Sequence, residues 1–186
     1  MKAKPFSAWM IGSALVWALA AAAPAAPPQQ QTPKLEPYQC GKVQRLHVFG
    51  NIFLASQPAK EDFQTAAENG IKTVLNLRAA GELDWDEGAW VKKLGMNYVN
   101  IPITPRTFTD QKIDQARKLL RDSKNRPLLV HCASANRVGA IWLAHRVLDH
   151  GLDYQQALKE ARTVGLRSPV LERIVRQYIA KRQRSQ

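Results

Sequence analysis

The residues best suited to chemistry lie in one short segment, His131 to Arg137, which reads His-Cys-Ala-Ser-Ala-Asn-Arg. It begins at the end of an apolar run, residues 127–131, and an amphipathic run follows it from Val138. A strand, a loop and a helix are therefore predicted in that order. Backbone N–H groups of such a loop converge with those of the first helical turn, and the helix dipole adds positive potential. The segment thus predicts a site for an anion.

Two side chains of this segment could act on a bound anion. A thiol beside a helix N-terminus and an arginine favours its thiolate form, so we expect Cys132 to be a nucleophile. The planar guanidinium of Arg137 can hold two oxygens of a phosphate at once, which a lysine cannot do. The alternative is a buried structural cysteine with a surface arginine. The rest of the predicted substrate-binding loop is Ala133, Ser134, Ala135 and Asn136.

Alternating strands and helices are predicted on both sides of this loop. Strands are expected at residues 43–49, 52–55, 71–77, 96–103 and 127–131, and helices at residues 59–68, 89–94, 110–121 and 138–150. Two more helices are expected after the capping residues Asp153 and Ser168. This order predicts an α/β fold with a central, mostly parallel sheet flanked by helices. Such sheets bind ligands beyond the carboxyl ends of their strands, where the Cys132 loop is expected.

The N-terminal region is predicted to be a targeting segment. A basic start, an apolar run and small residues over residues 1–26 are typical of a secretory signal peptide, and an uncleaved membrane anchor is the alternative. We expect an exported protein, periplasmic or secreted, that meets a membrane only through this segment if it is uncleaved. Residues 27–37 are predicted to be a linker, rich in proline and glutamine, and residues 38–186 one folded domain.

The net charge and the histidine and cysteine content limit which ligands and partners the protein is expected to bind. The net charge of +12 favours anionic, phosphorylated substrates, but the sequence lacks a recognisable nucleic-acid module, so no nucleic-acid partner is expected. No cofactor is expected, and the histidines and cysteines show no metal-ligand spacing. His145 is interpreted as a core histidine. Cys40 and Cys132 are the two cysteines, and either a structural or a regulatory disulfide between them remains open.

The Cys132 loop resembles the signature loop of the cysteine-dependent phosphatases. The similar branch is bacterial, is related to dual-specificity phosphatases, and is often described as the phosphatase-like domain of beta-lactamase-hydrolase-like proteins. Residues 54–58, 69–78 and 99–102 stand in the order that this branch shows. The resemblance implies a cysteine-phosphatase-like fold and hydrolysis of phosphotyrosine or another phosphomonoester through a phosphocysteine. It also implies that Arg137 holds the phosphate oxygens and that His131 orients the loop.

The segment departs from that family pattern in ways that leave other functions open. Four residues separate Cys132 from Arg137, where phosphatases usually have five, and this spacing is similar to that of rhodanese sulfurtransferases, which carry a persulfide. A non-catalytic phosphate- or anion-binding module is a third interpretation. Val138 stands where many phosphatases have a serine or threonine that eases departure of the thiolate.

The general acid is the role for which the sequence offers several candidates. Thr104 and Pro105 stand where dual-specificity phosphatases often place an aspartate. The remaining candidates for the acid are Glu82, Asp84, Asp86 and Asp110. Arg78 follows a predicted buried strand, where it could either brace the loop or contact the substrate.

Overall fold

The computed structural model describes residues 33–185 of the chain. The predicted signal segment, residues 1–26, and the first part of the predicted linker, residues 27–32, lie outside this range. The described strands are β1 (Leu35–Pro37), β2 (Leu46–Phe49), β3 (Ile52–Ala55), β4 (Thr73–Asn76), β5 (Asn97–Asn100) and β6 (Leu128–His131). The described helices are α1 (Lys60–Glu68), α2 (Glu87–Lys93), α3 (Asp110–Arg121), the short 3-10 helix η1 (Ser123–Asn125), α4 (Asn136–His150), α5 (Tyr154–Val164) and α6 (Pro169–Arg184).

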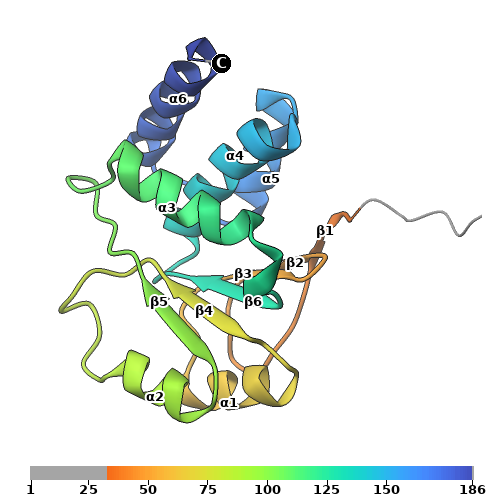
Figure 1. Ribbon diagram of the computed structural model, residues 1–186, viewed down its shortest axis with the longest axis vertical. Helices are drawn as coiled ribbons and strands as arrows, with labels where there is room; N and C mark the ends of the chain where they lie inside the picture. The colour runs from red at the N-terminus through yellow and green to blue at the C-terminus, as the bar shows by residue number, and fades with distance from the viewer. Residues whose placement is uncertain (1–32, 186) are drawn as a thin grey trace, which may run out of the picture. The chain divides into compact units, whose positions relative to one another are not determined.

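The six strands form one mixed sheet in the order β1-β2-β3-β6-β4-β5. Strands β3, β6, β4 and β5 are parallel to their neighbours in this group, whereas β1 and β2 pair antiparallel at one edge. Helices α3 to α6 cover one face of the sheet, and α1 and α2 cover the other (Figure 1). The predicted α/β fold with a mostly parallel, helix-flanked sheet is therefore confirmed.

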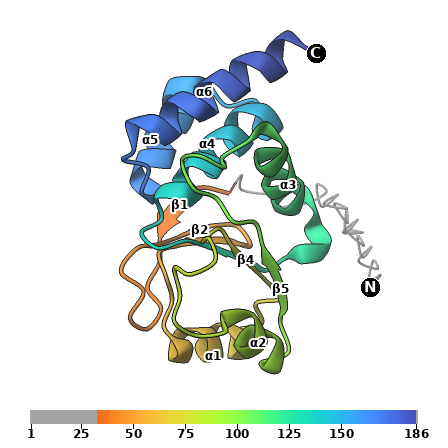
Figure 2. The same cartoon turned by 90° about the vertical axis from the view of Figure 1, so that its left-hand side faces the viewer.

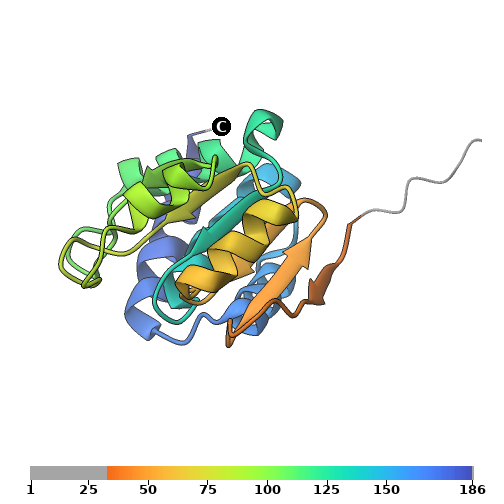
Figure 3. The same cartoon turned by 90° about the horizontal axis from the view of Figure 1, so that it is seen from below.

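Side chains that alternate across the central strands fill two separate cores. Leu128 and Val130 of β6 point into the larger core beneath α3 to α6, where Trp142 is fully buried. Leu129 of β6 points into the smaller core, against Phe63 of α1. This alternation is the period-two pattern of a strand buried on both faces. Figures 2 and 3 show the two helical layers from the side and from below.

Strands β2, β4, β5 and β6 are shorter than the predicted ones, and the boundaries of other elements differ as well. Residues 35–37, placed in the predicted linker, form β1, because their backbone pairs with β2 and Leu35 packs against the larger core. Helix α2 begins at Glu87 instead of Ala89, since the Asp86 carboxylate accepts a bond from the Ala89 N–H at 2.8 Å. Helix α4 begins at Asn136 instead of Val138. In the described part of the chain, no helix is long and apolar enough to cross a membrane.

Substituting Asp149 with asparagine is expected to lower the free energy of unfolding by about 3 kcal/mol. Both oxygens of this buried carboxylate accept bonds from Arg117, at 2.5 and 3.0 Å, and the buried arginine would keep only the more distant Asp114 carboxylate, 3.7 Å away, as an ionic partner. Burial raises the pKa of Asp149, but the bonds from His145 and Arg117 outweigh it and hold the pKa well below 3.8. The contribution is therefore present at neutral pH and is lost as the pH falls below that value.

Urea unfolding at pH 7 measures this effect, with Asp110→Asn as the matched control. The Asp110 carboxylate pairs with Lys181, whose side chain is 64% exposed, so its loss should cost less than about 1 kcal/mol. Equal losses in the two variants would show that burial of the Arg117 pair does not matter for stability.

Candidate active site

The carboxyl ends of the parallel strands bring the predicted site together. His131 is the last residue of β6, the strand that lies between β3 and β4, and Cys132 follows it at once. The Leu77 N–H donates to the His131 carbonyl at 2.9 Å, and the Gln57 N–H donates to the Ala133 carbonyl at 3.3 Å. The segments that leave β4 and β3 therefore hold the start of the Cys132 loop from both sides.

The loop closes through a left-handed residue at the start of α4. Ala135 has φ +64° and is fully buried. A Cβ atom on Gly165 would lie 2.9 Å from the Ala135 Cβ, so the glycine makes room for this turn. The Asn136 Oδ1 atom accepts bonds from the N–H groups of Arg167 at 3.0 Å and Ser168 at 3.2 Å. Asn136 thus ties the loop to the connection between α5 and α6.

A cavity of about 340 Å³ opens beside this loop. Its lining residues are Glu82, Ile103, Thr104, Pro105, Ser134, Asn136, Arg137, Ser168 and Leu171. Of the other predicted loop residues, Ala133 is exposed at the surface, whereas the Cys132 side chain is fully buried. A group that is to meet the Cys132 sulfur must therefore enter the loop itself.

Arg137 is held along one edge of its guanidinium. Its Nη1 and Nη2 groups donate to the two carboxylate oxygens of Glu82, each at 2.7 Å. Nη1 also donates to the carbonyls of Leu77 at 3.2 Å and Ile103 at 2.9 Å. No oxygen atom of residues 33–185 accepts a hydrogen bond from the Nε atom of the guanidinium. The Nε edge is free to donate to an oxyanion in the loop.

The charges around Arg137 stabilise one another. The bond from Arg137 is the main cause that lowers the pKa of Glu82 to about 2, against an opposing effect of burial. Burial lowers the pKa of Arg137, but the bond to Glu82 and the nearby charge of Cys132 outweigh it, so the pKa is raised. Glu82 is therefore ionised at neutral pH and holds no proton to donate.

Substituting Glu82 with glutamine is expected to lower kcat/KM for p-nitrophenyl phosphate about a hundredfold. The amide presents one oxygen and one NH₂ group to Arg137, so the two-bond fork is lost and the guanidinium is free to move. We expect most of the loss in kcat, because a displaced arginine stabilises the transition state less than the bound ester. Steady-state kinetics measure this division between kcat and KM.

The matched control for this prediction is Glu160→Gln. Glu160 makes the same kind of fork to Arg146, at 2.8 and 3.1 Å, between α5 and α4. Its loss should lower stability and leave kcat/KM within about twofold. Equal losses of activity in the two variants would contradict a positioning role for Glu82.

Arg78 is a brace in this structure. Its Nη1 group donates to the Gln57 Oε1 atom at 2.8 Å, and its Nη2 group donates to the Glu82 carbonyl. Its Nε atom lies 3.5 Å from the Glu82 carboxylate. Arg78 therefore supports Glu82 together with Arg137, and it is absent from the lining of the 340 Å³ cavity.

His131 lies over a buried carboxylate that the sequence analysis missed. Its Nε2 atom is 3.1 Å from the Glu87 Oε1 atom, and both side chains are almost fully buried. Glu87 also accepts bonds from Gln57 at 2.6 Å, Asn76 at 2.7 Å and Tyr98 at 3.2 Å. Burial raises the pKa of Glu87, but His131 and these donors outweigh it and lower the pKa. The Glu87 carboxylate therefore lies against the imidazole at the base of the Cys132 loop.

None of the three aspartates proposed as the general acid lines the cavity. Asp86 caps α2, and Asp110 pairs with Lys181 at 2.7 Å. Asp84 is exposed on the connection before α2. Glu82 is the one carboxylate among the described lining residues, and it is already ionised. A leaving group in this cavity therefore meets no protonated carboxylic acid from the described lining.

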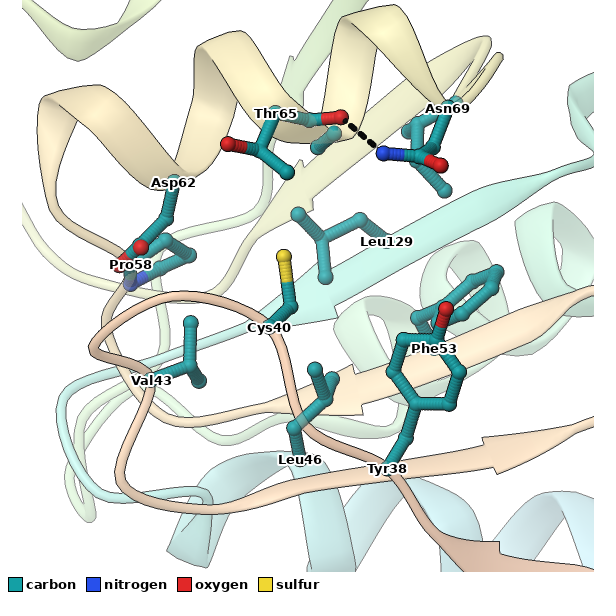
Figure 4. A pocket seen from close by; sticks show the side chains of 12 residues that line it. Tyr38, Cys40, Val43, Leu46, Phe53, Pro58, Asp62, Thr65, Asn69 and Leu129 are labelled. Carbon is teal, nitrogen blue, oxygen red and sulfur yellow. Dashed lines mark hydrogen bonds between the residues drawn. The ribbon is translucent and has the colours of Figure 1, made fainter.

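Cys40 lies on the other side of the sheet from Cys132. Both cysteines are free. Cys132 belongs to the larger core, whereas Cys40 packs against the smaller one. Its sulfur points into an apolar pocket of about 60 Å³ between α1 and the sheet, near Leu129 (Figure 4). Burial and the charge of Asp62 raise the pKa of Cys40, so its thiolate is disfavoured at neutral pH.

Substituting Cys40 with serine is expected to leave recovery from oxidation unchanged. A disulfide requires Cα atoms within about 7 Å, and the sheet separates the environments of the two thiols. The test is hydrogen peroxide treatment followed by dithiothreitol, with recovered phosphatase activity as the readout. Recovery in wild type together with permanent loss in Cys40→Ser would show that the two cysteines do pair.

Two further predictions, that His145 is a core histidine and that no metal site is present, concern residues away from the Cys132 loop. His145 is buried, and its Nδ1 atom lies 2.8 Å from Asp149, as a core histidine would. Burial lowers the pKa of His145, which outweighs the bond to Asp149. Among residues 33–185, no three histidine, cysteine, aspartate or glutamate side chains are grouped so that they could hold a metal ion.

A buried cysteine after a central strand, followed by a helix whose first turn carries an arginine, is typical of cysteine-phosphatase folds. The chain belongs to the family described as "DSP-PTPase phosphatase fused to NAD+ Kinase", which matches residues 45–175. The predicted resemblance to bacterial dual-specificity-like phosphatases is thereby confirmed.

Relatives and solved structures agree with this family. A beta-lactamase hydrolase-like protein from Agrobacterium fabrum is 27% identical over 103 residues, which are 53% of this chain and 24% of the relative. The chain thus spans about a quarter of that relative's length. A DUF442 protein from Shewanella putrefaciens has a TM-score of 0.63 at 20% identity, over 75% of this chain and 94% of that one. P. aeruginosa TpbA, solved in complex with pTyr, has a TM-score of 0.58 at 20% identity, over 72% and 82% of the two chains.

Proposed function

We propose that this protein is a phosphatase that hydrolyses phosphotyrosine, or a closely similar phosphomonoester, through a phosphocysteine on Cys132. The observation that carries the proposal is the arrangement of Arg137. Glu82 holds the Nη1 and Nη2 groups of its guanidinium, no oxygen of residues 33–185 accepts a bond from Nε, and the buried Cys132 lies at the start of the same loop. That arrangement suits an oxyanion bound in the loop, with the sulfur beneath it.

In the first step the Cys132 thiolate attacks phosphorus. The S–P bond forms, the P–O bond to the leaving group breaks, and the leaving oxygen takes the electron pair. Arg137 and the loop N–H groups donate to the phosphoryl oxygens, where charge develops. In the second step water attacks phosphorus and the S–P bond breaks, which returns the thiolate and releases phosphate. Val138 offers no hydroxyl to the departing sulfur, so this second step is expected to be the slower one.

The ligands of structural neighbours support an anionic substrate. TpbA was solved with pTyr, and PTPMT1, whose structure has a TM-score of 0.60 to this chain, was solved with PI(5)P. Both ligands carry a phosphomonoester, and the net charge of +12 favours such substrates by long-range attraction.

Two assays on one reduced preparation test the proposal: hydrolysis of p-nitrophenyl phosphate and transfer of sulfur from thiosulfate to cyanide. We expect phosphate release in wild type and none above background in Cys132→Ser. Thiocyanate production that depends on Cys132, without phosphate release, would instead support the rhodanese-like sulfurtransferase. Phosphopeptide binding with no turnover of either kind would support the non-catalytic anion-binding module.

The site of action is also a proposal. The predicted signal peptide, residues 1–26, would deliver the enzyme to the periplasm or the medium. Expression of the full chain in a bacterial host, followed by cell fractionation and intact-mass measurement, tests this expectation. A full-length product confined to the cytoplasm would contradict export.

A further inference from the structure

Two exposed arginines without a carboxylate partner adjoin the cavity lining in the sequence. Arg106 directly follows the lining residues Thr104 and Pro105, and Arg167 directly precedes the lining residue Ser168. Both side chains are exposed, and no carboxylate of residues 33–185 forms a recorded ion pair with either one. Their long, unpaired cationic side chains are therefore available to a ligand.

Carboxylates pair with the neighbouring arginines. Glu82 pairs with both Arg78 and Arg137 at the cavity, and Asp149 and Glu160 pair with arginines in the helical layer. Because one carboxylate faces two arginines at the cavity, this group keeps a positive charge, and Arg106 and Arg167 add to it. A ligand that fills the cavity would bring the compensating negative charge.

The backbone of each unpaired arginine is anchored to the site. The Thr104 N–H donates to the Thr107 Oγ1 atom at 3.0 Å, and the Thr107 N–H donates to the Thr104 Oγ1 atom at 3.2 Å, so a tight turn carries Arg106. The Arg167 N–H donates to Asn136, which directly precedes Arg137 in α4. The backbone of each arginine is therefore held close to the Cys132 loop and Arg137, which would bind the phosphate.

The cavity also restricts the leaving group. Its one lining carboxylate, Glu82, is fully engaged by Arg137, so the described lining holds no acid to protonate a poor leaving group. A phenolate leaves without such help far more readily than an alkoxide. The phosphate ester should therefore be an aryl ester, and the two free guanidinium groups should meet a second anion on the same molecule.

Resting on the proposed function, we propose that Arg106 and Arg167 recognise carboxylates beside the phosphate, so that the preferred substrate is a phosphotyrosine with acidic neighbours in its peptide. The contacts lie at the rim and are partly solvated. Each is therefore expected to change kcat/KM by at most about fivefold, and rising ionic strength should weaken it.

The experiment compares two phosphotyrosine peptides of equal length, one with aspartates on both sides of the phosphotyrosine and one with asparagines in their places. The leaving group is the same in both, so the ratio of their kcat/KM values reports only on the second anion. The ratio is measured in wild type, Arg106→Gln, Arg167→Gln and Lys124→Gln. Lys124 is the matched control, an exposed cation in η1 at the opposite end of β6 from the Cys132 loop.

Wild type should favour the acidic peptide about tenfold at low salt. Each arginine variant should lower this ratio about threefold, and Lys124→Gln should leave it unchanged. A wild-type ratio near one, or an equal fall in Lys124→Gln, would overturn the inference. So would faster turnover of an inositol bisphosphate than of the acidic peptide, because the substrate would then be a polyphosphorylated alkyl ester.

The same two peptides titrated calorimetrically into Cys132→Ser separate this inference from the proposed function. Preference for the acidic peptide in binding supports recognition by the two arginines even if wild type shows no hydrolysis. Hydrolysis that depends on Cys132, with equal affinities for the two peptides, would uphold the phosphatase and reject the second anion.

Discussion

Substituting Arg137 with lysine is expected to lower kcat/KM for p-nitrophenyl phosphate about a thousandfold, which corresponds to about 4 kcal/mol of transition-state stabilisation. Lysine keeps the positive charge but cannot hold Glu82 with two bonds and also donate to the phosphoryl oxygens from a second edge. The kcat/KM value and the affinity for vanadate, which mimics the pentacoordinate transition state, should fall together.

Arg146→Lys is the matched control for this loss. Arg146 lies on the same helix, α4, and Glu160 holds it with a similar fork. Its replacement should lower stability and leave kcat/KM within about twofold. A loss in Arg137→Lys of less than about tenfold would mean that the guanidinium does not carry the charge that develops on the phosphoryl group.

We expect kcat/KM for a phosphoserine peptide to be about a thousandfold lower than for the matched phosphotyrosine peptide. The described cavity lining offers no protonated acid, and general acid catalysis is typically worth about 10²–10⁴ in rate. The alkoxide of serine needs that proton more than the phenolate of tyrosine does. Measuring kcat/KM for both peptides, with p-nitrophenyl phosphate as the substrate with the best leaving group, gives the leaving-group dependence.

The three aspartates suggested by the sequence provide the counter-test: Asp84→Asn, Asp86→Asn and Asp110→Asn. Each variant should leave the ratio of the two peptide rates unchanged. Suppose instead that one variant loses phosphotyrosine turnover and keeps p-nitrophenyl phosphate turnover. That aspartate would then be the general acid, brought to the substrate by a movement of its loop.

Local sequence patterns were enough to predict most of the framework and the order of strand, loop and helix around Cys132. The continuous apolar run of β6 predicts a strand buried on both faces, and Asp153 and Ser168 cap α5 and α6 as expected. Cys132 and Arg137 could be predicted because strand, loop and helix follow one another directly in the chain. The predictions were wrong for β1, which sheet pairing decides, and for the start of α2, which a capping carboxylate decides.

The partners of these residues could not be predicted, because they come from distant parts of the chain. Glu82 and Glu87 belong to one acidic stretch, in which nothing local distinguishes the residues that face inward from the exposed Asp84. The sheet order places β4 beside β6 and so brings the stretch after β4 to the Cys132 loop. Only then does one carboxylate meet Arg137 and the other meet His131.

The most direct test of the account is to trap the covalent intermediate. Wild type is mixed with p-nitrophenyl phosphate, quenched rapidly in denaturant and digested, and the peptide that contains Cys132 is analysed by mass spectrometry. The account predicts one added phosphoryl group on Cys132, formed at least as fast as p-nitrophenol is released and absent in Cys132→Ser. Turnover without any phosphorylated cysteine, or undiminished turnover in Cys132→Ser, would contradict the assignment of Cys132 as the nucleophile.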